Sequence, residues 1–207
     1  MNIIIPINGR NERLGCLFST PKHLLLYQGH PALYWSLHNL VNAFSFAKIT
    51  ILANKIYIDE IRQINQYYDV RVIQVESTNS QVETLLQFTK TLEGDAMFVD
   101  CDIIPMRINF PMSNLVYVFD NVRKDKQYSN FVTQEDLITG CNEKDMLYKW
   151  AGAGVYYFDH VKIFNECALG EKNISGVIMN AIKQGYEFKI NSDNEIFRFG
   201  TLSDIIS

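Results

Sequence analysis

Two aspartates follow a short apolar run in the segment MFVDCDIIP. Asp100 and Asp102 are two residues apart, with Cys101 between them. Two carboxylates at this spacing on a strand are expected to point to one face, where they repel each other unless a cation or hydrogen-bond donors intervene. Because such a pair is costly when nothing compensates it, we expect both to bind Mg²⁺, together with phosphate oxygens. The competing interpretation is that one aspartate caps the next turn and the other faces water.

The loop that follows the first apolar run carries three cations. It spans residues 8–22, which is long for a connection between a strand and a helix. It contains Gly9, Arg10, Arg13 and Lys22. Backbone N–H groups of such a loop can wrap a phosphate chain, while Arg supplies a fork of donors and Lys a point charge. The loop matches neither the Walker A nor the GxGxxG pattern, and taken alone it is slightly more typical of a solvated surface loop than of a phosphate site.

A third polar segment, ESTNSQVETLLQ, precedes an expected helix. Ser80 and Glu83 have the spacing of a capping box, in which each side chain accepts a hydrogen bond from a backbone N–H group at the helix start. Capping explains most of this segment. A helix that begins here would also present free N–H groups to a ligand.

The first half of the chain alternates short apolar runs with helical patterns. This order is typical of βαβ crossovers, so we expect a mostly parallel sheet with helices on both faces. Ligands of such sheets collect beyond the carboxyl ends of the strands, here the loops after Pro6, Val75 and Val99. Strands are expected at Ile3–Ile7, Ile49–Ala53, Val70–Val75 and Ala96–Val99, and helices at Pro31–Phe46, Ile56–Tyr68 and Gln81–Leu92.

The second half is richer in strands with short polar links, which indicates an antiparallel or mixed extension of the sheet. No Pro-, Ser- or Gly-rich linker separates the halves, so we expect a single domain over residues 1–207. Strands are expected at Leu115–Asp120, Asn130–Thr133, Leu137–Cys141, Gly154–Phe158 and Tyr186–Ile190, a helix at Ser175–Gln184 and a helical turn at Leu202–Ile206.

Composition narrows the functional classes. The chain has 207 residues, 47% of them hydrophobic, and a net charge of −4, which argues against broad nucleic-acid binding. Four scattered cysteines without a CxxC pattern indicate free thiols in a reducing compartment. We see neither a secretory signal nor a membrane span, and expect a cytoplasmic protein. The 11 Tyr and 13 Phe leave room for an aromatic interface between copies.

Taken in order, the motifs resemble the sugar nucleotidyltransferase family, the nucleoside-diphosphate-sugar pyrophosphorylases. The resemblance covers almost the whole chain. Within the family, the chain is most similar to a bacterial capsule-pathway branch that has a Cys-Asp pair at the metal-binding strand. The segments that carry it are IIIPINGRNERL, TPKHLL, SQVETLL, FVDCDII, YSNF, NEKD, WAGAGVYYFD and FGTLSDI.

The resemblance implies a Rossmann-like three-layer α/β/α sandwich with a mixed, mostly parallel sheet. It also implies a Mg²⁺-dependent transfer of a nucleoside monophosphate from a nucleoside triphosphate to a sugar phosphate or similar phosphorylated acceptor, with release of pyrophosphate, for a surface polysaccharide precursor. The same resemblance implies that the catalytic residues are Arg13, Lys22 and Asp102 and that the metal ligands are Asp102 and Asp100. The residues that it implies for nucleotide binding are Ile7, Asn8, Gly9, Asn11, Ser80, Glu83 and Asp100. Those that it implies for acceptor binding are Glu143, Lys144, Gly152 and Arg198.

Three positions depart from the family pattern. Asn11 and Ser80 stand where glycines are common, and Arg198 stands where many members have a metal-binding Asp. A guanidinium cannot bind Mg²⁺, so either Asp193 or Glu195 replaces that ligand, or Asp102 and the phosphates suffice, or Arg198 itself meets a phosphate of the acceptor. Two alternatives therefore stay open: a non-catalytic nucleotide-binding relative, and a glycosyltransferase that uses the Asp-Cys-Asp motif for its metal.

Overall fold

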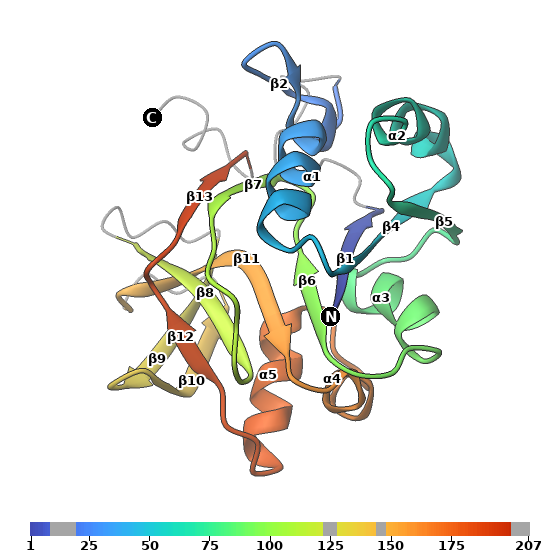
Figure 1. The fold of residues 1–207 in the computed structure, drawn as a ribbon. Coiled ribbons are helices and arrows are strands. Elements are labelled where there is room, and N and C mark those ends of the chain that lie inside the picture. The colour runs from blue at the N-terminus through green and yellow to red at the C-terminus, as the bar shows by residue number, and fades with distance from the viewer. Residues whose placement is uncertain (9–19, 122–127, 144–147, 200–207) are drawn as a thin grey trace.

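The computed structural model describes residues 1–8, 20–121, 128–143 and 148–199, and the side chain of Glu143 is outside this description. Within these residues the main sheet has nine strands (Figure 1). Their order is β5 (Arg71–Val75), β4 (Lys48–Asn54), β1 (Asn2–Ile7), β6 (Ala96–Val99), β11 (Trp150–Phe158), β8 (Leu115–Asp120), β12 (Lys189–Asn191), β10 (Leu137–Glu143) and β9 (Ser129–Gln134).

The sheet is mixed. Strands β5, β4, β1 and β6 run parallel to one another, as the alternation of strands and helices predicts. Strand β11 is antiparallel to both β6 and β8, and β12 returns parallel to β8. Strands β9 and β10 pair antiparallel at the far edge. The parallel half therefore directs the carboxyl ends of its strands, and the loops after them, to one edge of the sheet.

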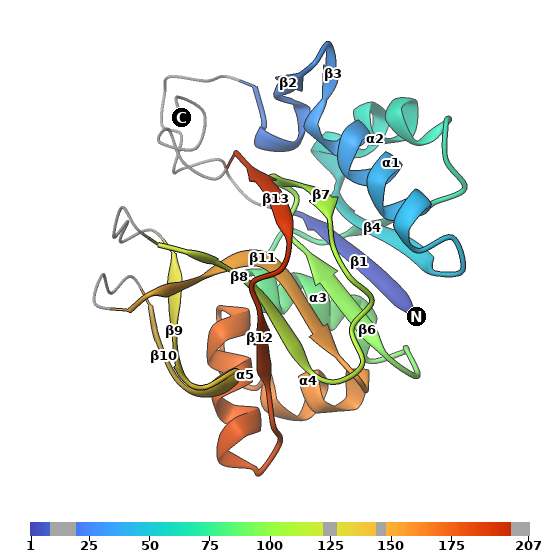
Figure 2. The ribbon, with the colours of Figure 1, turned by 60° about the vertical axis from the view of Figure 1, so that its left-hand side comes forward.

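Helices cover both faces of the sheet and complete the three layers (Figures 1 and 2). Along β1, Ile3 and Ile5 pack into one core with the apolar stripes of α1 (Ala32–Ala43) and α2 (Ile58–Asn65). Ile4 points to the other face and packs into a second core. The helices of that core are α3 (Gln81–Thr89), α4 (Val161–Cys167) and α5 (Ile174–Lys183). A strand buried on both faces explains the continuous aliphatic run at the start of the chain.

Two small antiparallel pairs lie outside the main sheet, and the sequence patterns did not predict them. Strand β7 (Ile103–Arg107) pairs with β13 (Glu195–Arg198), as Figure 1 shows. Strands β2 (Leu26–Tyr27) and β3 (His30–Pro31) form a hairpin before α1. The β7–β13 pair places Glu195–Arg198 beside the turn after β6.

Most expected elements are present with shifted ends. The expected helix Ile56–Tyr68 is wrong in extent, because a 3₁₀ turn at Lys55–Tyr57 precedes α2. The expected strand Tyr186–Ile190 is shorter and later, at Lys189–Asn191. Helix α4 was not expected, and the helical turn expected at Leu202–Ile206 lies outside the described residues.

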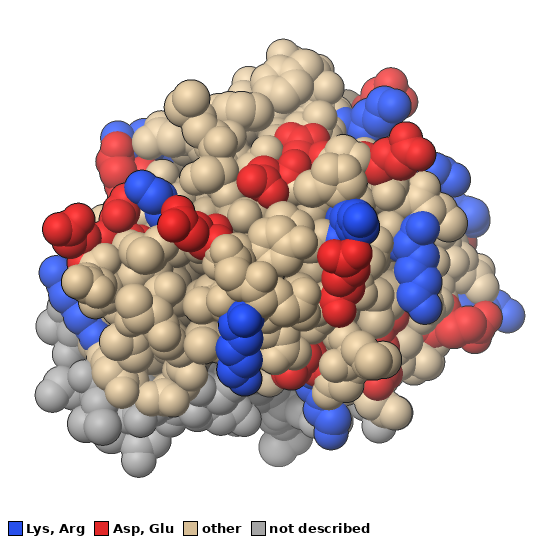
Figure 3. Space-filling model, turned by 90° about the horizontal axis from the view of Figure 1, so that it is seen from below, with Lys and Arg blue, Asp and Glu red and all other residues tan. Residues whose placement is uncertain are grey.

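Charges of both signs are interspersed on the face seen in Figure 3, where Lys and Arg side chains alternate with Asp and Glu. Among the described residues, no helix has the length and apolar character needed to cross a bilayer.

Candidate functional site

Polar side chains tie together the ends of β1, β4 and β5. Asn8 follows β1, and its amide nitrogen lies 3.0 Å from both the Glu76 carbonyl oxygen and Thr78 Oγ1 and 3.1 Å from Thr84 Oγ1. The amide nitrogen of Asn54 donates to Asn8 Oδ1 over 3.1 Å. Both the nitrogen and the oxygen of the Asn8 amide thus contact protein groups, so this side chain joins the ends of β1, β4 and β5. The nucleotide contact expected of Asn8 and Ile7 stays a prediction.

The start of α3 is capped as the sequence predicts. Ser80 Oγ accepts a hydrogen bond from the N–H of Glu83 over 3.1 Å, and Glu83 Oε2 accepts one from the N–H of Asn79 over 3.0 Å. These bonds satisfy the N–H group of Glu83 in the first turn and that of Asn79, the residue before the N-cap Ser80. The capping role of Ser80 and Glu83 is confirmed, and their contact with a nucleotide stays a prediction.

The end of the cationic loop reaches the turn after β6. Lys22 begins a 3₁₀ turn (Lys22–Leu24), and its Nζ lies 2.9 Å from Asp102 Oδ2. The two side chains are only 11% and 20% exposed. In such a partly buried environment an ion pair is stronger than on the surface, and the loss of one partner destabilises the protein. The structure thus brings together Lys22 and Asp102, which lie 80 positions apart in the chain.

Asp100 is held by two elements. The Gln81 side chain, at the first position of α3, donates a hydrogen bond to Asp100 Oδ1, and the Asp100 N–H donates to the Gly154 carbonyl oxygen over 2.8 Å. Gly154 has φ +84°, and a Cβ there would stand 3.0 Å from Asp100 Oδ2. This position, at an irregularity of β11, therefore requires glycine both for its backbone and for the approach of the carboxylate.

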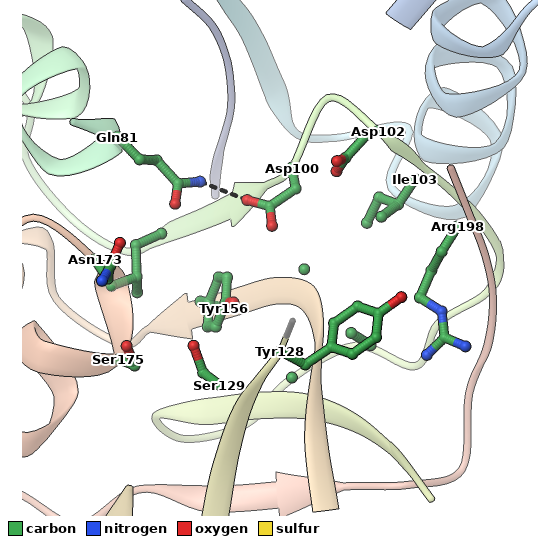
Figure 4. A pocket seen from close by; sticks show the side chains of 14 residues that line it. Gln81, Asp100, Asp102, Ile103, Tyr128, Ser129, Tyr156, Asn173, Ser175 and Arg198 are labelled. Carbon is green, nitrogen blue, oxygen red and sulfur yellow. Dashed lines mark hydrogen bonds between the residues drawn. The ribbon is translucent and has the colours of Figure 1, made fainter. Parts of the chain in front are cut away.

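The strand expected at Ala96–Val99 is confirmed as β6, and Asp100 and Asp102 lie in the turn that follows it, before β7, rather than on the strand itself. This turn brings both carboxylates to one pocket. Figure 4 shows them on one side of it and Ser129 and Ser175 on the opposite side. The lining residues are Gln81, Asp100, Asp102, Ile103, Tyr128, Ser129, Gly152, Ala153, Gly154, Tyr156, Asn173, Ile174, Ser175 and Arg198.

Arg198 stands at the edge of this pocket, beside the ring of Tyr128 (Figure 4). In the β7–β13 pair it is opposite Ile103, and the N–H of the next residue, Phe199, donates to the Asp102 carbonyl oxygen over 2.7 Å. The guanidinium carbon lies 3.3 Å from the ring centroid of Phe119. Arg198 is thus a stacked cation of the pocket.

Asp193 and Glu195 do not replace a metal ligand. Both bind Arg107, at 3.1 and 3.4 Å, on the exposed side of the β7–β13 pair. Neither residue lines the pocket. Two of the three explanations for Arg198 therefore remain. Either Asp102 and the substrate phosphates suffice to bind the metal, or Arg198 itself contacts a phosphate of the acceptor.

The donor set fits Mg²⁺. Among the described residues no group of three or more His, Cys, Asp and Glu side chains converges on one point, so this part of the chain offers a metal the two aspartates as acidic ligands. Mg²⁺ is commonly bound in this way, with water and substrate phosphates as the other ligands. Cys101 does not compete, because burial, followed by the charges of Asp102 and Asp100, raises the pKa of its thiol. A protonated thiol is a poor ligand.

Some expected site residues lie outside the described part of the chain: Gly9, Asn11, Arg13 and Lys144. Glu143 ends β10, and its side chain is not described. Gly152 does line the pocket, where a Cβ would meet the ring of Phe131 and the Tyr156 hydroxyl at 3.3 Å. Its expected position on the acceptor side is compatible with this location.

Sequence reasoning missed Gln81, Asn173 and Ser175 as pocket residues. The sequence did indicate the position of Gln81: it follows the helix cap Ser80, and α3 begins at the edge of the sheet where the parallel strands end. Asn173 and Ser175 mark the beginning of α5, which was expected to start at Ser175 without a role in the site. Their place in the pocket depends on how α5 packs against β10 and α4, and no local pattern reports that packing.

Solved structures similar to this fold include proteins named as a pyrophosphorylase, a cytidylyltransferase and a CTP transferase, all at low sequence identity. A nucleoside-diphosphate-sugar pyrophosphorylase from Vibrio cholerae RC9 matches with TM-score 0.80 and 15% identity over 99% of this chain and 98% of the other. CTP:phosphocholine cytidylyltransferase from Streptococcus pneumoniae matches with TM-score 0.78 and 15% identity over 99% and 96%. An inositol-1-phosphate CTP transferase from T. maritima matches with TM-score 0.77 and 14% identity over 98% and 90%. The sequence matches no protein-family model and no curated protein. At this identity the likeness establishes the fold.

Proposed function

We propose that the chain is a Mg²⁺-dependent nucleotidyltransferase that transfers a nucleoside monophosphate from a nucleoside triphosphate to a phosphorylated acceptor. The observation that carries the proposal is the pair of carboxylates, Asp100 and Asp102, at the carboxyl end of β6 with Lys22 against Asp102. The likeness of the whole chain to structures named as a nucleoside-diphosphate-sugar pyrophosphorylase, a CTP transferase and a cytidylyltransferase supports it.

The reaction conserves charge and atoms as follows. A phosphate oxygen of the acceptor attacks the α-phosphorus of the triphosphate, the bond from that phosphorus to the bridging oxygen breaks, and pyrophosphate leaves. Negative charge grows on the α-phosphate oxygens and on the leaving group, so fixed cations and donors lower the barrier. The protein supplies mainly positioning and electrostatic stabilisation.

Each described residue has a place in this scheme. Asp100 and Asp102 would hold Mg²⁺, which when bound neutralises part of the phosphate charge. Lys22 pairs with Asp102 at 2.9 Å, and its ammonium would contact the phosphate chain instead if Asp102 held Mg²⁺, because both cations favour the same carboxylate. Gln81 orients Asp100 through its amide N–H. Arg13 is proposed as a further phosphate-binding cation from the resemblance.

The test is pyrophosphate release with each nucleoside triphosphate, Mg²⁺ and a panel of phosphorylated acceptors. We expect Asp102→Ala to lower the rate at least about 100-fold, since it removes a metal ligand. Asp136→Ala is the matched control, because Asp136 is an exposed aspartate paired with Lys189 at 3.1 Å. Release that survives Asp102→Ala would refute this site.

The same assay separates the two alternatives. A glycosyltransferase would release a nucleoside diphosphate from a nucleotide sugar and would not use triphosphate. A non-catalytic relative would bind nucleotide without turnover across the panel. We further propose a cytoplasmic location and a role in a surface polysaccharide precursor; the free cysteines among the described residues, Cys101, Cys141 and Cys167, support a reducing compartment.

A further inference from the structure

Two aromatic rings of the pocket region form a corner that holds a cation of the chain itself. The ring centroids of Phe119 and Tyr128 are 5.0 Å apart, and the ring planes meet at 85°. The guanidinium carbon of Arg198 lies 3.3 Å from the Phe119 centroid and 5.3 Å from the Tyr128 centroid. Aromatic faces attract cations, and this corner would otherwise suit the cationic group of a ligand.

The position of Arg198 is fixed from the backbone as well. Its strand, β13, pairs with β7 so that Arg198 is opposite Ile103, and Phe199 donates to the carbonyl oxygen of Asp102. One side of the guanidinium plane therefore rests on Phe119 while its backbone is joined to the turn that carries Asp102. A cation held in this way loses little freedom when it binds a ligand.

Stacking uses the face of a guanidinium, whereas hydrogen bonds are made by the N–H groups in its plane. A pair of neighbouring N–H groups of a guanidinium matches the two oxygens of a carboxylate or phosphate and can bind them through two parallel hydrogen bonds. Arg198 lines the same pocket as Asp100 and Asp102 and is half-buried there. The pocket therefore has an acidic wall suited to a metal and a separate cationic group suited to an anion.

Resting on the proposed nucleotidyl transfer, we propose that the acceptor carries a second anionic group besides its reacting phosphate, and that Arg198 binds this group. The reacting phosphate belongs near the metal, beside Asp100 and Asp102, and the second anion belongs at the guanidinium. Hydroxyl and amide groups of Ser129, Asn173 and Ser175 also line the pocket, on the side away from Arg198 (Figure 4), and suit a polar body of the acceptor. A cationic acceptor is disfavoured, because the aromatic corner already contains a positive charge.

Three forms of one sugar phosphate test the proposal. Glucose 1-phosphate, glucuronic acid 1-phosphate and glucose 1,6-bisphosphate differ only at carbon 6, which carries a hydroxyl, a carboxylate or a phosphate. Glycerol 3-phosphate and 3-phosphoglycerate form a smaller matched pair, and choline phosphate is the cationic probe. Binding is measured by calorimetry and turnover by pyrophosphate release. In at least one set we expect the affinity of the acidic member to exceed that of the neutral member by about tenfold or more, because the acidic member gains one charge-assisted contact.

Variants assign this preference to Arg198. Arg198→Gln is expected to bring the acidic and neutral members within about twofold, while Arg198→Lys keeps part of the difference, because an ammonium lacks the planar fork. Phe119→Leu removes the stacking surface but keeps the charge, and is expected to reduce the preference partly. Arg107→Gln is the matched control: Arg107 lies on the same strand pair, bound to Asp193 and Glu195 on its exposed side. Circular dichroism and thermal unfolding establish that each variant folds.

The outcomes separate this inference from the proposed reaction. A preference for neutral or cationic acceptors, a preference for acidic ones that survives Arg198→Gln, or no binding of any acidic member overturns the acceptor class. In each of these cases pyrophosphate release with any acceptor would leave the transfer reaction standing. Arg198-dependent binding of acidic members without pyrophosphate release would instead overturn the reaction and keep the acceptor site.

Discussion

Lys22 Nζ and Asp102 Oδ2 lie 2.9 Å apart, each side chain mostly buried, at the point where a metal ion and a triphosphate would meet. The ion pair satisfies Asp102 when no metal is present. It also places the ammonium where a phosphate chain would need it. Metal and nucleotide binding should therefore be coupled, since the phosphates would attract Lys22 and expose Asp102 to the metal.

Removal of this cation should destabilise the metal-free protein. Lys22→Met leaves Asp102 without its partner, and we expect the free energy of unfolding to fall by about 1–3 kcal/mol. Added Mn²⁺ should restore more stability to the variant than to the wild type, because no ammonium then competes for Asp102. Urea unfolding with and without Mn²⁺ measures both effects. Lys189→Met is the control, since Lys189 pairs with Asp136 at 3.1 Å on the surface and should cost less than about 1 kcal/mol.

Orientation of Asp100 by Gln81 should appear in metal affinity. Gln81→Leu removes the hydrogen bond to Asp100 Oδ1, and we expect Mn²⁺ affinity to fall about 10-fold or more, as for other groups that hold metal ligands in place. Electron paramagnetic resonance of Mn²⁺ with a non-hydrolysable triphosphate gives this affinity. Gln87→Leu is the control, because Gln87 also makes side-chain hydrogen bonds, to the backbone of Glu76, without contact to Asp100. Equal losses in the two variants would contradict the role of Gln81.

Gly154 should tolerate no side chain. Gly154 has φ +84°, and a Cβ there would lie 3.0 Å from Asp100 Oδ2. Gly154→Ala is therefore expected to lower the free energy of unfolding by about 1–3 kcal/mol and to weaken metal binding, because the added methyl group displaces the carboxylate. Gly140→Ala provides the comparison, because Gly140 lies in β10 with only ordinary contacts to Val132. Thermal unfolding and Mn²⁺ titration of both variants measure the difference; a Gly154→Ala protein as stable and as metal-binding as Gly140→Ala would show that the close approach is unimportant.

His23 should make stability depend on pH. It is 3% exposed, its Nε2 has no hydrogen-bond partner among the residues that the structure describes, and burial lowers its pKa from 6.5 to about 4. Between these values the unfolded chain binds a proton that the folded protein does not, so stability is complete above pH 6.5 and falls as the pH drops toward 4, by up to about 3 kcal/mol. His23→Leu should lack this component. Urea unfolding between pH 4 and 7.5 should therefore give a steeper decline for the wild type, and parallel curves would contradict the assignment.

The sequence predicted the part of the site that depends on order along the chain. Parallel strands bring their carboxyl ends to one edge, and this alone places Asn8, the capped start of α3 and the Asp100–Asp102 pair together. The capping box of Ser80 and Glu83 was equally predictable, because its partners are close in sequence.

The opposite side of the pocket depends on contacts between distant segments. Arg198 reaches it through the β7–β13 pair, whose strands are about 90 residues apart and carry no clear alternation. Tyr128 and Phe119 become its partners only when β8 and the start of β9 are in place. The sequence could show that a guanidinium replaces an expected carboxylate, but the aromatic corner that holds it needed the fold.

The most direct test of the central claim is to follow the phosphorus atoms of the triphosphate. The chain is incubated with Mg²⁺, an acceptor that binds, and triphosphate labelled at the α- or the γ-phosphorus. Attack at the α-phosphorus predicts that the α-label enters the acceptor product and the γ-label leaves as pyrophosphate, both lost in Asp102→Ala. Transfer of the γ-label to the acceptor, or its release as orthophosphate, would contradict nucleotidyl transfer at this site.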